Sequence, residues 1–213
     1  VLIEPVQGEG GIRVASADYL RQLRALCDER GWLLMIDEIQ AGMGRTGAWF
    51  GHQHAGITPD VMTLAKALGN GFPIGACLAR GGAADLFSPG QHGSTFGGNP
   101  LACAVALAVS TEVHKPEFLQ HVRDVGDYLI EGLEKLKRET NSIEAIRGKG
   151  LMIGIDTVFD IKKLMPALLK AGMIATQAGD RSLRITPPLT LTRAQADEAL
   201  QIIGDVIRKG DLA

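Results

Sequence analysis

The sequence contains few cysteines, and their spacing excludes two common kinds of site. Only three cysteines occur among 213 residues, at positions 27, 77 and 103, and no two of them form a C-x-x-C pair. This spacing argues against both a zinc site and a disulfide framework, and it favours a reducing compartment such as the cytoplasm. The apolar or helical surroundings of the three thiols predict that they are buried side chains.

The sequence also lacks a strong excess of charge and a long apolar run. The formal net charge is −2, and the basic residues form no long run. Nucleic acids and anionic membranes are bound through basic patches, so neither is an expected partner. Charged residues interrupt every apolar stretch before it reaches membrane-spanning length. With 46% hydrophobic residues, the chain can form a globular core.

An initiator methionine and a signal peptide are absent as well. The chain begins with the run VLIEPVQGEGG. An apolar run at the first residue is typical of a buried strand, so we expect the sequence to be a piece of a longer protein.

The hydrophobic pattern predicts an α/β architecture. Ser16 and Gly31 bracket an amphipathic stretch, as a helix N-cap and C-cap do. Continuous apolar strands separated by a helix are typical of an open parallel sheet buried on both faces. The expected strands cover residues 1–5, 32–37, 61–65 and 74–79.

From about residue 113 the pattern changes to that of a smaller α/β domain. A long amphipathic helix is expected over 118–139, and Thr192 with Gln195 forms a capping box for a final helix. Between them we expect a strand over 146–156, a helix over 161–171 with Pro166 in its first turn or at a kink, and a strand over 182–186. The expected domains are therefore 1–112 and 113–213.

Two residues at predicted strand ends suggest chemistry. Asp37 closes the run WLLMID, and Lys66 follows VMTLA. A lysine buried among apolar neighbours can attack a carbonyl as the free amine, and an aspartate can keep a ring nitrogen protonated. The alternative is structural: Lys66 extends into solvent and Asp37 caps a turn. From these two residues alone the structural alternative is favoured.

Five motifs in order resemble the class III (ω-amino acid) aminotransferases. They are VLIEPVQGEGG, WLLMIDEIQAGMGRTG, TLAKALGNGFPIGA, HGSTFGGNPLACAVALAV and LRITPPLTLT. Within this family they are most similar to the acetylornithine-type enzymes. The resemblance implies a fold type I pyridoxal-phosphate (PLP) transferase. It implies that residues 1–112 are the C-terminal part of a large domain with a mixed, mostly parallel sheet, and 113–213 a small C-terminal domain.

The resemblance also assigns roles to individual residues around the cofactor. Lys66 matches the lysine that forms a Schiff base with PLP, and Asp37 matches the acid paired with the pyridine nitrogen. Ile39 matches the aliphatic residue packed on the ring, and Gln40 matches the residue hydrogen-bonded to the ring hydroxyl. Thr95 matches the hydroxyl that reaches the cofactor phosphate of the neighbouring subunit, which implies a homodimer with a shared active site.

Two further residues match substrate-binding positions of the family. Arg184 matches the arginine that grips the α-carboxylate of glutamate or 2-oxoglutarate. Glu9 matches the acid that pairs with this arginine and swings away when the carboxylate arrives. A planar guanidinium suits bidentate carboxylate recognition. The structural alternatives are a solvated loop acid for Glu9 and a surface ion pair for Arg184.

The implied function is transfer of the terminal amino group of N-acetylornithine to 2-oxoglutarate in arginine biosynthesis, in the cytoplasm. Another ω-aminotransferase, acting on ornithine, succinylornithine or 4-aminobutyrate, is the first alternative. The second is a non-catalytic fragment that needs a missing N-terminal half. The phosphate-binding loop and the ring-stacking aromatic residue of the family have no match in this sequence.

Other local patterns carry weaker signals. GMGRTG (42–47) looks like a phosphate-binding loop, but it matches a family loop near the dimer interface, and Arg45 is expected to be structural. His52 and His54 lack a nearby acid or thiol partner, so no metal site is expected. RGKGLMIG lacks the serine or threonine and the spacing of a P-loop.

Overall fold

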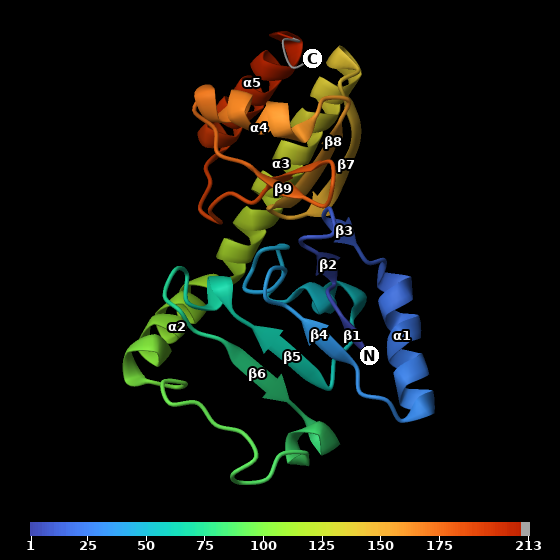
Figure 1. Cartoon of the computed structure of the whole chain (residues 1–213), viewed down its shortest axis with the longest axis vertical. Coiled ribbons are helices and arrows are strands. Elements are labelled where there is room, and N and C mark those ends of the chain that lie inside the picture. The colour runs from blue at the N-terminus through green and yellow to red at the C-terminus, as the bar shows by residue number, and fades with distance from the viewer. Residues whose placement is uncertain (210–213) are drawn as a thin grey trace. The chain divides into compact units, whose positions relative to one another are not determined.

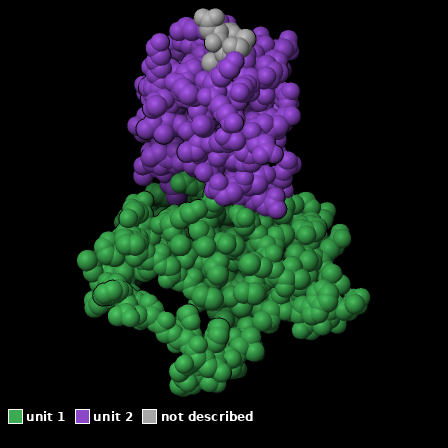
Figure 2. Space-filling view, in the orientation of Figure 1, with its two compact units in different colours: residues 1–6, 15–119 green, residues 7–14, 120–213 purple. Residues whose placement is uncertain are grey.

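The computed structural model describes residues 1–209, which belong to two compact units (Figures 1 and 2). Unit 1 contains Val1–Val6 and Ala15–Leu119, and unit 2 contains Gln7–Val14 and Gln120–Ala213. The segment 7–14 thus belongs with the C-terminal part of the chain. The expected boundary between residues 112 and 113 lies at the end of a helix and stays a prediction about separate domains.

Unit 1 is built on a four-stranded mixed sheet. Its strands are β1 (Leu2–Ile3), β4 (Met35–Asp37), β5 (Val61–Leu64) and β6 (Ala76–Ala79), in the order β1-β4-β5-β6. The first three are parallel, whereas β6 runs antiparallel to β5. This confirms the mixed, mostly parallel sheet that the family resemblance implied, whereas the apolar pattern alone predicted an open parallel sheet without the antiparallel β6. The connection from β5 to β6 covers residues 65–75 and includes η2, and parallel neighbours need a crossover of about a dozen or more residues.

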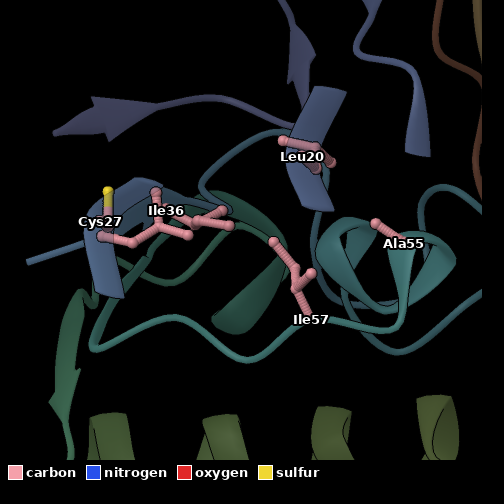
Figure 3. Packing of buried hydrophobic residues seen from close by; sticks show 6 residues of the cluster. Leu20, Cys27, Ile36, Ala55 and Ile57 are labelled. Atoms are coloured by element: carbon pink, nitrogen blue, oxygen red, sulfur yellow. The ribbon is translucent and has the colours of Figure 1, made fainter. Parts of the chain in front are cut away.

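Helix α1 (Ala17–Arg30) covers the sheet of unit 1 and confirms the predicted caps. The Ser16 side chain accepts a hydrogen bond from the Tyr19 amide, and Gly31 ends the helix in the left-handed region. Leu20 and Cys27 of α1 lie in one buried cluster with Ile36 of β4 (Figure 3). Ala55 and Ile57 complete the labelled set. This packing holds β4, and with it Asp37, against the helix.

The start of β4 differs from the expected strand over 32–37. Trp32 and Leu33 are exposed, and regular pairing begins only at Met35. The Leu34 amide donates to a carboxylate oxygen of Asp60 instead of a neighbouring strand. The expectation that the whole run WLLMID is buried on both faces is therefore wrong for its first two residues.

The remaining elements of unit 1 are short except for α2 (Pro100–Val113). Asn99 caps α2 through its side chain, which accepts from the Ala102 amide. Three 3-10 helices precede it: η1 (Gly51–Ala55), η2 (Lys66–Leu68) and η3 (Gly81–Asp85). Leu101 and Leu107 of α2 are exposed, and so are Phe87 and Phe96 before it. Unit 1 thus carries apolar side chains that nothing covers among the described residues.

Unit 2 contains an antiparallel sheet in the order β7-β8-β10-β9. The strands are β7 (Ile143–Lys149), β8 (Met152–Thr157), β9 (Thr176–Ala178) and β10 (Ser182–Ile185), and β2 (Val6–Gln7) pairs with β3 (Arg13–Val14) in a separate sheet. The single strand expected over 146–156 is wrong. The segment is a hairpin, because Gly150 adopts φ 56° and reverses the chain between β7 and β8.

The helices of unit 2 are α3 (Pro116–Thr140, in unit 2 from Gln120), α4 (Ile161–Lys170) and α5 (Arg193–Lys209). The predicted apolar stripe of α3 is buried from Val122 to Leu136. The Thr192–Gln195 capping box is confirmed by reciprocal hydrogen bonds. Pro166 lies inside α4, beyond its first turn.

Alternation along the strands divides the central sheet residues of unit 2 into two sets. Ile153 of β8 and Ile185 of β10 are paired in register and border a cavity together with side chains of α3 and α5. Gly154 and Asp156 point to the other face, where a Cβ on Gly154 would lie 2.7 Å from the Cβ of Ile12. The segment 7–14 therefore packs on the face opposite the helices.

The cysteine expectation is only partly correct. Cys27 is buried, but Cys77 and Cys103 are exposed. Cys77 lies on β6, which is an edge strand, and Cys103 lies on α2 between the exposed Leu101 and Leu107. Among residues 1–209, no helix is both long and apolar enough to cross a membrane.

Candidate active site

Asp37 and Lys66 follow from two neighbouring parallel strands of unit 1. Asp37 ends β4 and is paired in register with Thr63 of β5. Lys66 comes three residues after Thr63, just beyond the end of β5. The carboxyl ends of parallel strands meet at one edge of a sheet, and ligands of α/β proteins bind beyond that edge. The structure therefore brings these two predicted residues to the same sheet edge.

The backbone at Lys66 is unusual. Its φ of 43° lies in the left-handed region, which costs a non-glycine residue about 1–2 kcal/mol and is frequent at functional sites. The turn is anchored by Leu68, which is buried with Met43, Met62 and Leu64. Gly69 is needed there, because a Cβ would lie 2.0 Å from the Phe72 carbonyl oxygen. The turn after Lys66 therefore brings backbone close to backbone.

Lys66 itself is exposed in unit 1. The sequence-based expectation of a lysine buried among apolar neighbours does not hold for this chain by itself. The apolar residues around it in sequence turn inward with Leu64 and Leu68, whereas the lysine follows the strand end and points out of the core.

Asp37 is half-buried, and the turn that follows it holds its carboxylate in place. The Ile39 amide donates to Asp37 Oδ1 at 2.9 Å, and the Glu38 amide donates to the Thr63 carbonyl at 3.0 Å. Ile39 and Gln40 are half-buried as well. The Thr63 hydroxyl is buried and has no hydrogen-bond partner among the described residues. A buried polar atom beside a carboxylate is an exception that needs a reason, and a bound group is one.

Glu38 is a buried residue of this edge that sequence reasoning missed. Its side chain is fully buried and accepts hydrogen bonds from the Gly51 amide, the His52 amide and His52 Nδ1, each at 2.9 Å. The Phe50 ring stacks on His52. These contacts tie the loop 38–52 back to the end of β4. The only signal in the sequence was an acid directly after a buried strand.

The expectation that His52 has no nearby acid is wrong, because Glu38 Oε1 lies 2.9 Å from its Nδ1. The remaining candidates of unit 1 are His54, Arg45 and Thr95. His54 contacts the Thr46 hydroxyl at 3.0 Å, and no group of three or more metal-ligating side chains occurs among residues 1–209. Burial lowers the pKa of Arg45 to about 10, which still leaves it protonated at neutral pH. Thr95 is exposed, in a loop before α2.

Glu9 and Arg184 lie together in unit 2. Arg184 Nη1 and Glu9 Oε1 are 2.5 Å apart, and Arg184 Nε donates to the Thr176 hydroxyl at 3.0 Å. The Arg184 side chain is 16% exposed, whereas the Glu9 side chain is 70% exposed. The arginine is held on β10 by its neighbours, and its acidic partner extends from the loop 8–11 into solvent.

A second arginine lies in the same row of this sheet. Arg147 of β7 and Arg184 of β10 are both paired in register with Gly154 of β8. Arg147 forms two parallel hydrogen bonds with Asp156, at 2.7 and 2.8 Å. These bonds raise the pKa of Arg147 and hold the pKa of Asp156 below its usual value. Sequence reasoning did not single out either residue.

Comparison with known proteins establishes the family. Residues 1–207 match the family described as aminotransferase class-III. The acetylornithine aminotransferase of Caldanaerobacter subterraneus subsp. tengcongensis is 47% identical over 97% of this chain and 53% of its own length. The chain belongs to the class-III aminotransferase family. It spans about half the length of the curated relatives it matches.

Solved structures share the fold. An acetylornithine aminotransferase from Elizabethkingia anophelis is 37% identical with a TM-score of 0.92, over 98% of this chain and 56% of that one. An ornithine aminotransferase from Toxoplasma gondii is 33% identical with a TM-score of 0.93, over 99% of this chain and 50% of that one. The latter structure shows partial occupancy of PLP at its active site. The fold is therefore that of the PLP-dependent aminotransferases.

The residues of unit 1 fit PLP as a ligand. A carboxylate, an amide and a primary amine come from Asp37, Gln40 and Lys66, and Ile39 adds an aliphatic side chain. This set suits an aromatic ring with a protonated nitrogen, a hydroxyl group and an aldehyde. The Thr63 hydroxyl beside Asp37, which has no hydrogen-bond partner among residues 1–209, is consistent with a group bound there.

Proposed function

We propose that this chain is part of an aminotransferase that moves the terminal amino group of N-acetylornithine to 2-oxoglutarate, a step of arginine biosynthesis in the cytoplasm. One observation carries the proposal. Asp37 and Lys66 follow adjacent parallel strands in a chain that matches the family over residues 1–207. The donor is inferred from the acetylornithine aminotransferases among its relatives.

Lys66 and Asp37 carry the chemistry in this proposal. PLP supplies, when bound, an electron-withdrawing ring that stabilises negative charge on the substrate carbon bearing the amino group. Lys66 binds the cofactor covalently and, once released, its Nζ takes a proton from that carbon. Asp37 keeps the ring nitrogen protonated, Ile39 packs on the ring, and Gln40 binds the ring hydroxyl.

Arg184 and Glu9 select between the two amino donors. Glutamate reacts through its α-amino group, so Arg184 binds the adjacent α-carboxylate with two hydrogen bonds. N-acetylornithine reacts through its terminal amino group and presents no carboxylate at that position. Glu9 then neutralises Arg184, and the 2.5 Å pair between them corresponds to this state.

A homodimer is part of the same proposal. Thr95 lies in an exposed loop and contributes its hydroxyl to the cofactor phosphate of the neighbouring subunit. The exposed Phe87, Phe96, Leu101 and Leu107 support this part, because apolar surface of this kind marks an interface. The same surface also fits the alternative in which the chain needs further polypeptide to form an active enzyme.

The test uses the full-length protein and its Lys66→Ala variant. We expect borohydride reduction of the PLP-loaded protein to leave a pyridoxyl group on Lys66, identified by peptide mass spectrometry. Lys66→Ala should lower turnover by at least about 10³-fold, because both the covalent link and the proton acceptor are lost. Lys162, an exposed residue of α4, supplies the control Lys162→Ala, which should keep both properties.

Substrate preference decides between the donors. We expect higher kcat/KM for N-acetylornithine than for ornithine, succinylornithine or 4-aminobutyrate, with 2-oxoglutarate as acceptor. Preference for 4-aminobutyrate would refute the assignment of the donor while leaving the reaction class intact. The 213-residue chain alone should show weak or no labelling of Lys66; strong labelling would refute the fragment alternative.

A further inference from the structure

The loop that carries Glu9 is attached to the sheet of unit 2 by its backbone. The Gly179 amide, in the turn between β9 and β10, donates to the Glu9 carbonyl at 2.6 Å. Two residues further on, Arg147 Nε donates to the Gly11 carbonyl at 3.1 Å. Both attachments use carbonyl groups, so neither restrains the Glu9 carboxylate.

The Arg147 side chain is itself fixed by a network of charged and polar groups. Its two Nη atoms bind the two carboxylate oxygens of Asp156, and Nη2 also donates to Ser182 Oγ at 2.9 Å. Ser182 Oγ in turn donates to Asp156 Oδ1 at 2.6 Å. The planar fork of arginine leaves Nε directed at Gly11 when both Nη atoms are engaged. Arginine can make all these bonds at once, and lysine cannot.

Packing restrains the loop at the same place. Ile12 is fully buried, and a Cβ on Gly154 would lie 2.7 Å from its Cβ, so only glycine at 154 leaves room for it. Gly11 has φ 94°, and a Cβ there would lie 3.2 Å from Ser182 Oγ. The backbone of residues 9–12 therefore lies against the row that contains both Arg147 and Arg184.

We propose that Arg147, with Asp156 and Ser182, is a positioning device that fixes the Glu9–Gly11 backbone, so that the Glu9–Arg184 pair opens by rotation of the Glu9 side chain alone. This inference rests on the proposed function, because it concerns how Arg184 is made available to one donor and withheld from the other. Arg147 does not touch substrate. Its contribution is to return Glu9 to Arg184 whenever no α-carboxylate is bound.

The test separates the two half-reactions in the full-length, PLP-loaded protein. Single-turnover rates are measured with N-acetylornithine and with glutamate. The rate with N-acetylornithine divided by the rate with glutamate is the donor ratio. Arg147→Lys keeps the positive charge but loses the planar guanidinium group, so we expect the donor ratio to fall about 10-fold. The matched control is Arg208→Lys on α5, where the arginine pairs with Glu139, and it should leave the ratio unchanged.

A double-mutant cycle distinguishes positioning from general structural support. Glu9→Gln alone should lower the ratio, and adding Arg147→Lys should lower it no further, because the side chain to be positioned has lost its charge. An equal loss in both half-reactions, or an undiminished effect of Arg147→Lys in the Glu9→Gln background, would overturn the proposal.

Hydrogen exchange supplies a readout that does not depend on the reaction. Amides of residues 8–14 should exchange about 10-fold faster in Arg147→Lys than in the wild type, and Arg208→Lys should not change them. Unchanged exchange would overturn the positioning role even if the proposed function holds. Absence of any half-reaction with N-acetylornithine in the wild type would instead refute the donor assignment, and the exchange result would still stand.

A milder variant covers the case in which Arg147→Lys does not fold. Ser182→Ala keeps the Arg147–Asp156 pair and removes only the hydroxyl that bridges them. We expect about a threefold fall in the ratio and faster exchange at residues 8–14. Wild-type values for both quantities would overturn the proposal.

Discussion

Two arginines in one row of the unit 2 sheet pair with acids that differ greatly in exposure. Arg147 binds Asp156, whose side chain is 13% exposed and belongs to the neighbouring strand. Arg184 binds Glu9, whose side chain is 70% exposed and belongs to a loop. An acid held in a strand by an arginine and a serine cannot leave without unfolding. An acid that extends into solvent can exchange its partner for water at little cost.

Under the proposed function, one sheet supports both folding and ligand exchange. The Arg147–Asp156 pair is a fixed part of the fold (the fixed pair). Under the proposed function, the Glu9–Arg184 pair is one that a substrate carboxylate replaces (the exchangeable pair). Under that function, the same residue type has a structural role at one position and a binding role at the other. The exposure of the acid, not the identity of the arginine, makes the difference.

Of the effects expected for these two pairs, the largest is a loss of kcat/KM when Arg184 is replaced. Arg184→Gln should lower kcat/KM for glutamate and 2-oxoglutarate by about 10²–10³-fold, since a charge-assisted bidentate contact to the substrate carboxylate is lost. The half-reaction with the terminal amino donor should change much less. Steady-state kinetics with each substrate varied in turn measures both effects.

Arg147→Gln is the matched control for that experiment, because it makes the same change in the same row of the sheet. It should not produce a selective loss for carboxylate substrates on this scale. Equal and selective losses in both variants would show that the two arginines do not differ in the way proposed.

Substitution of Arg147 should lower the free energy of unfolding more than substitution of Arg184, which is the reverse of their effects on kcat/KM. Arg147→Met leaves the carboxylate of Asp156 largely buried, with Ser182 as its side-chain hydrogen-bond donor and Arg181 Nε 3.8 Å away, which should cost about 2–4 kcal/mol in the free energy of unfolding. Arg184→Met leaves Glu9 exposed to water and should cost less than about 1 kcal/mol. Urea denaturation followed by circular dichroism measures both. A larger loss in Arg184→Met would contradict the assignment of Arg147 to the fold.

The fixed pair should contribute to the pH dependence of stability at low pH. The hydrogen bond from Arg147 holds the pKa of Asp156 below the usual 3.8, although burial opposes the shift. A depressed pKa in the folded state contributes stability above pH 3.8, which is lost as the pH falls through the folded-state value. Asp156→Asn should therefore flatten the fall in the urea midpoint below about pH 4. A steeper fall in this variant would show the opposite sign of linkage.

Local signals in the sequence predicted much of the fold. Ser16 and Gly31 bounded α1, and Thr192 with Gln195 marked the start of α5, because caps depend on residues only a few positions apart. The strands that precede Asp37 and Lys66 followed from the apolar runs. The direction of β6 did not, since the tight turn at Gly69 depends on a contact with the Phe72 backbone.

The proposed positioning device, Arg147 with Asp156 and Ser182, could not be found from local patterns. Arg147 contacts Gly11, which is 136 positions away, and Ser182, which is 35 positions away. No periodicity or spacing rule joins such residues, and each has an ordinary neighbourhood in the sequence. Glu9 and Arg184 are 175 positions apart and were identified only through the resemblance to a family.

The smallest expected effect concerns the acid of the exchangeable pair. Glu9→Gln keeps a hydrogen-bond acceptor near Arg184 but removes the charge, and the side chain is mostly in water. The free energy of unfolding should therefore change by less than about 0.5 kcal/mol, whereas Asp156→Asn should cost clearly more at pH 7. Urea denaturation of the two variants side by side gives the comparison. A loss in Glu9→Gln as large as in Asp156→Asn would mean that Glu9 is as firmly held as Asp156, and a side chain held that firmly could not yield Arg184 to a substrate.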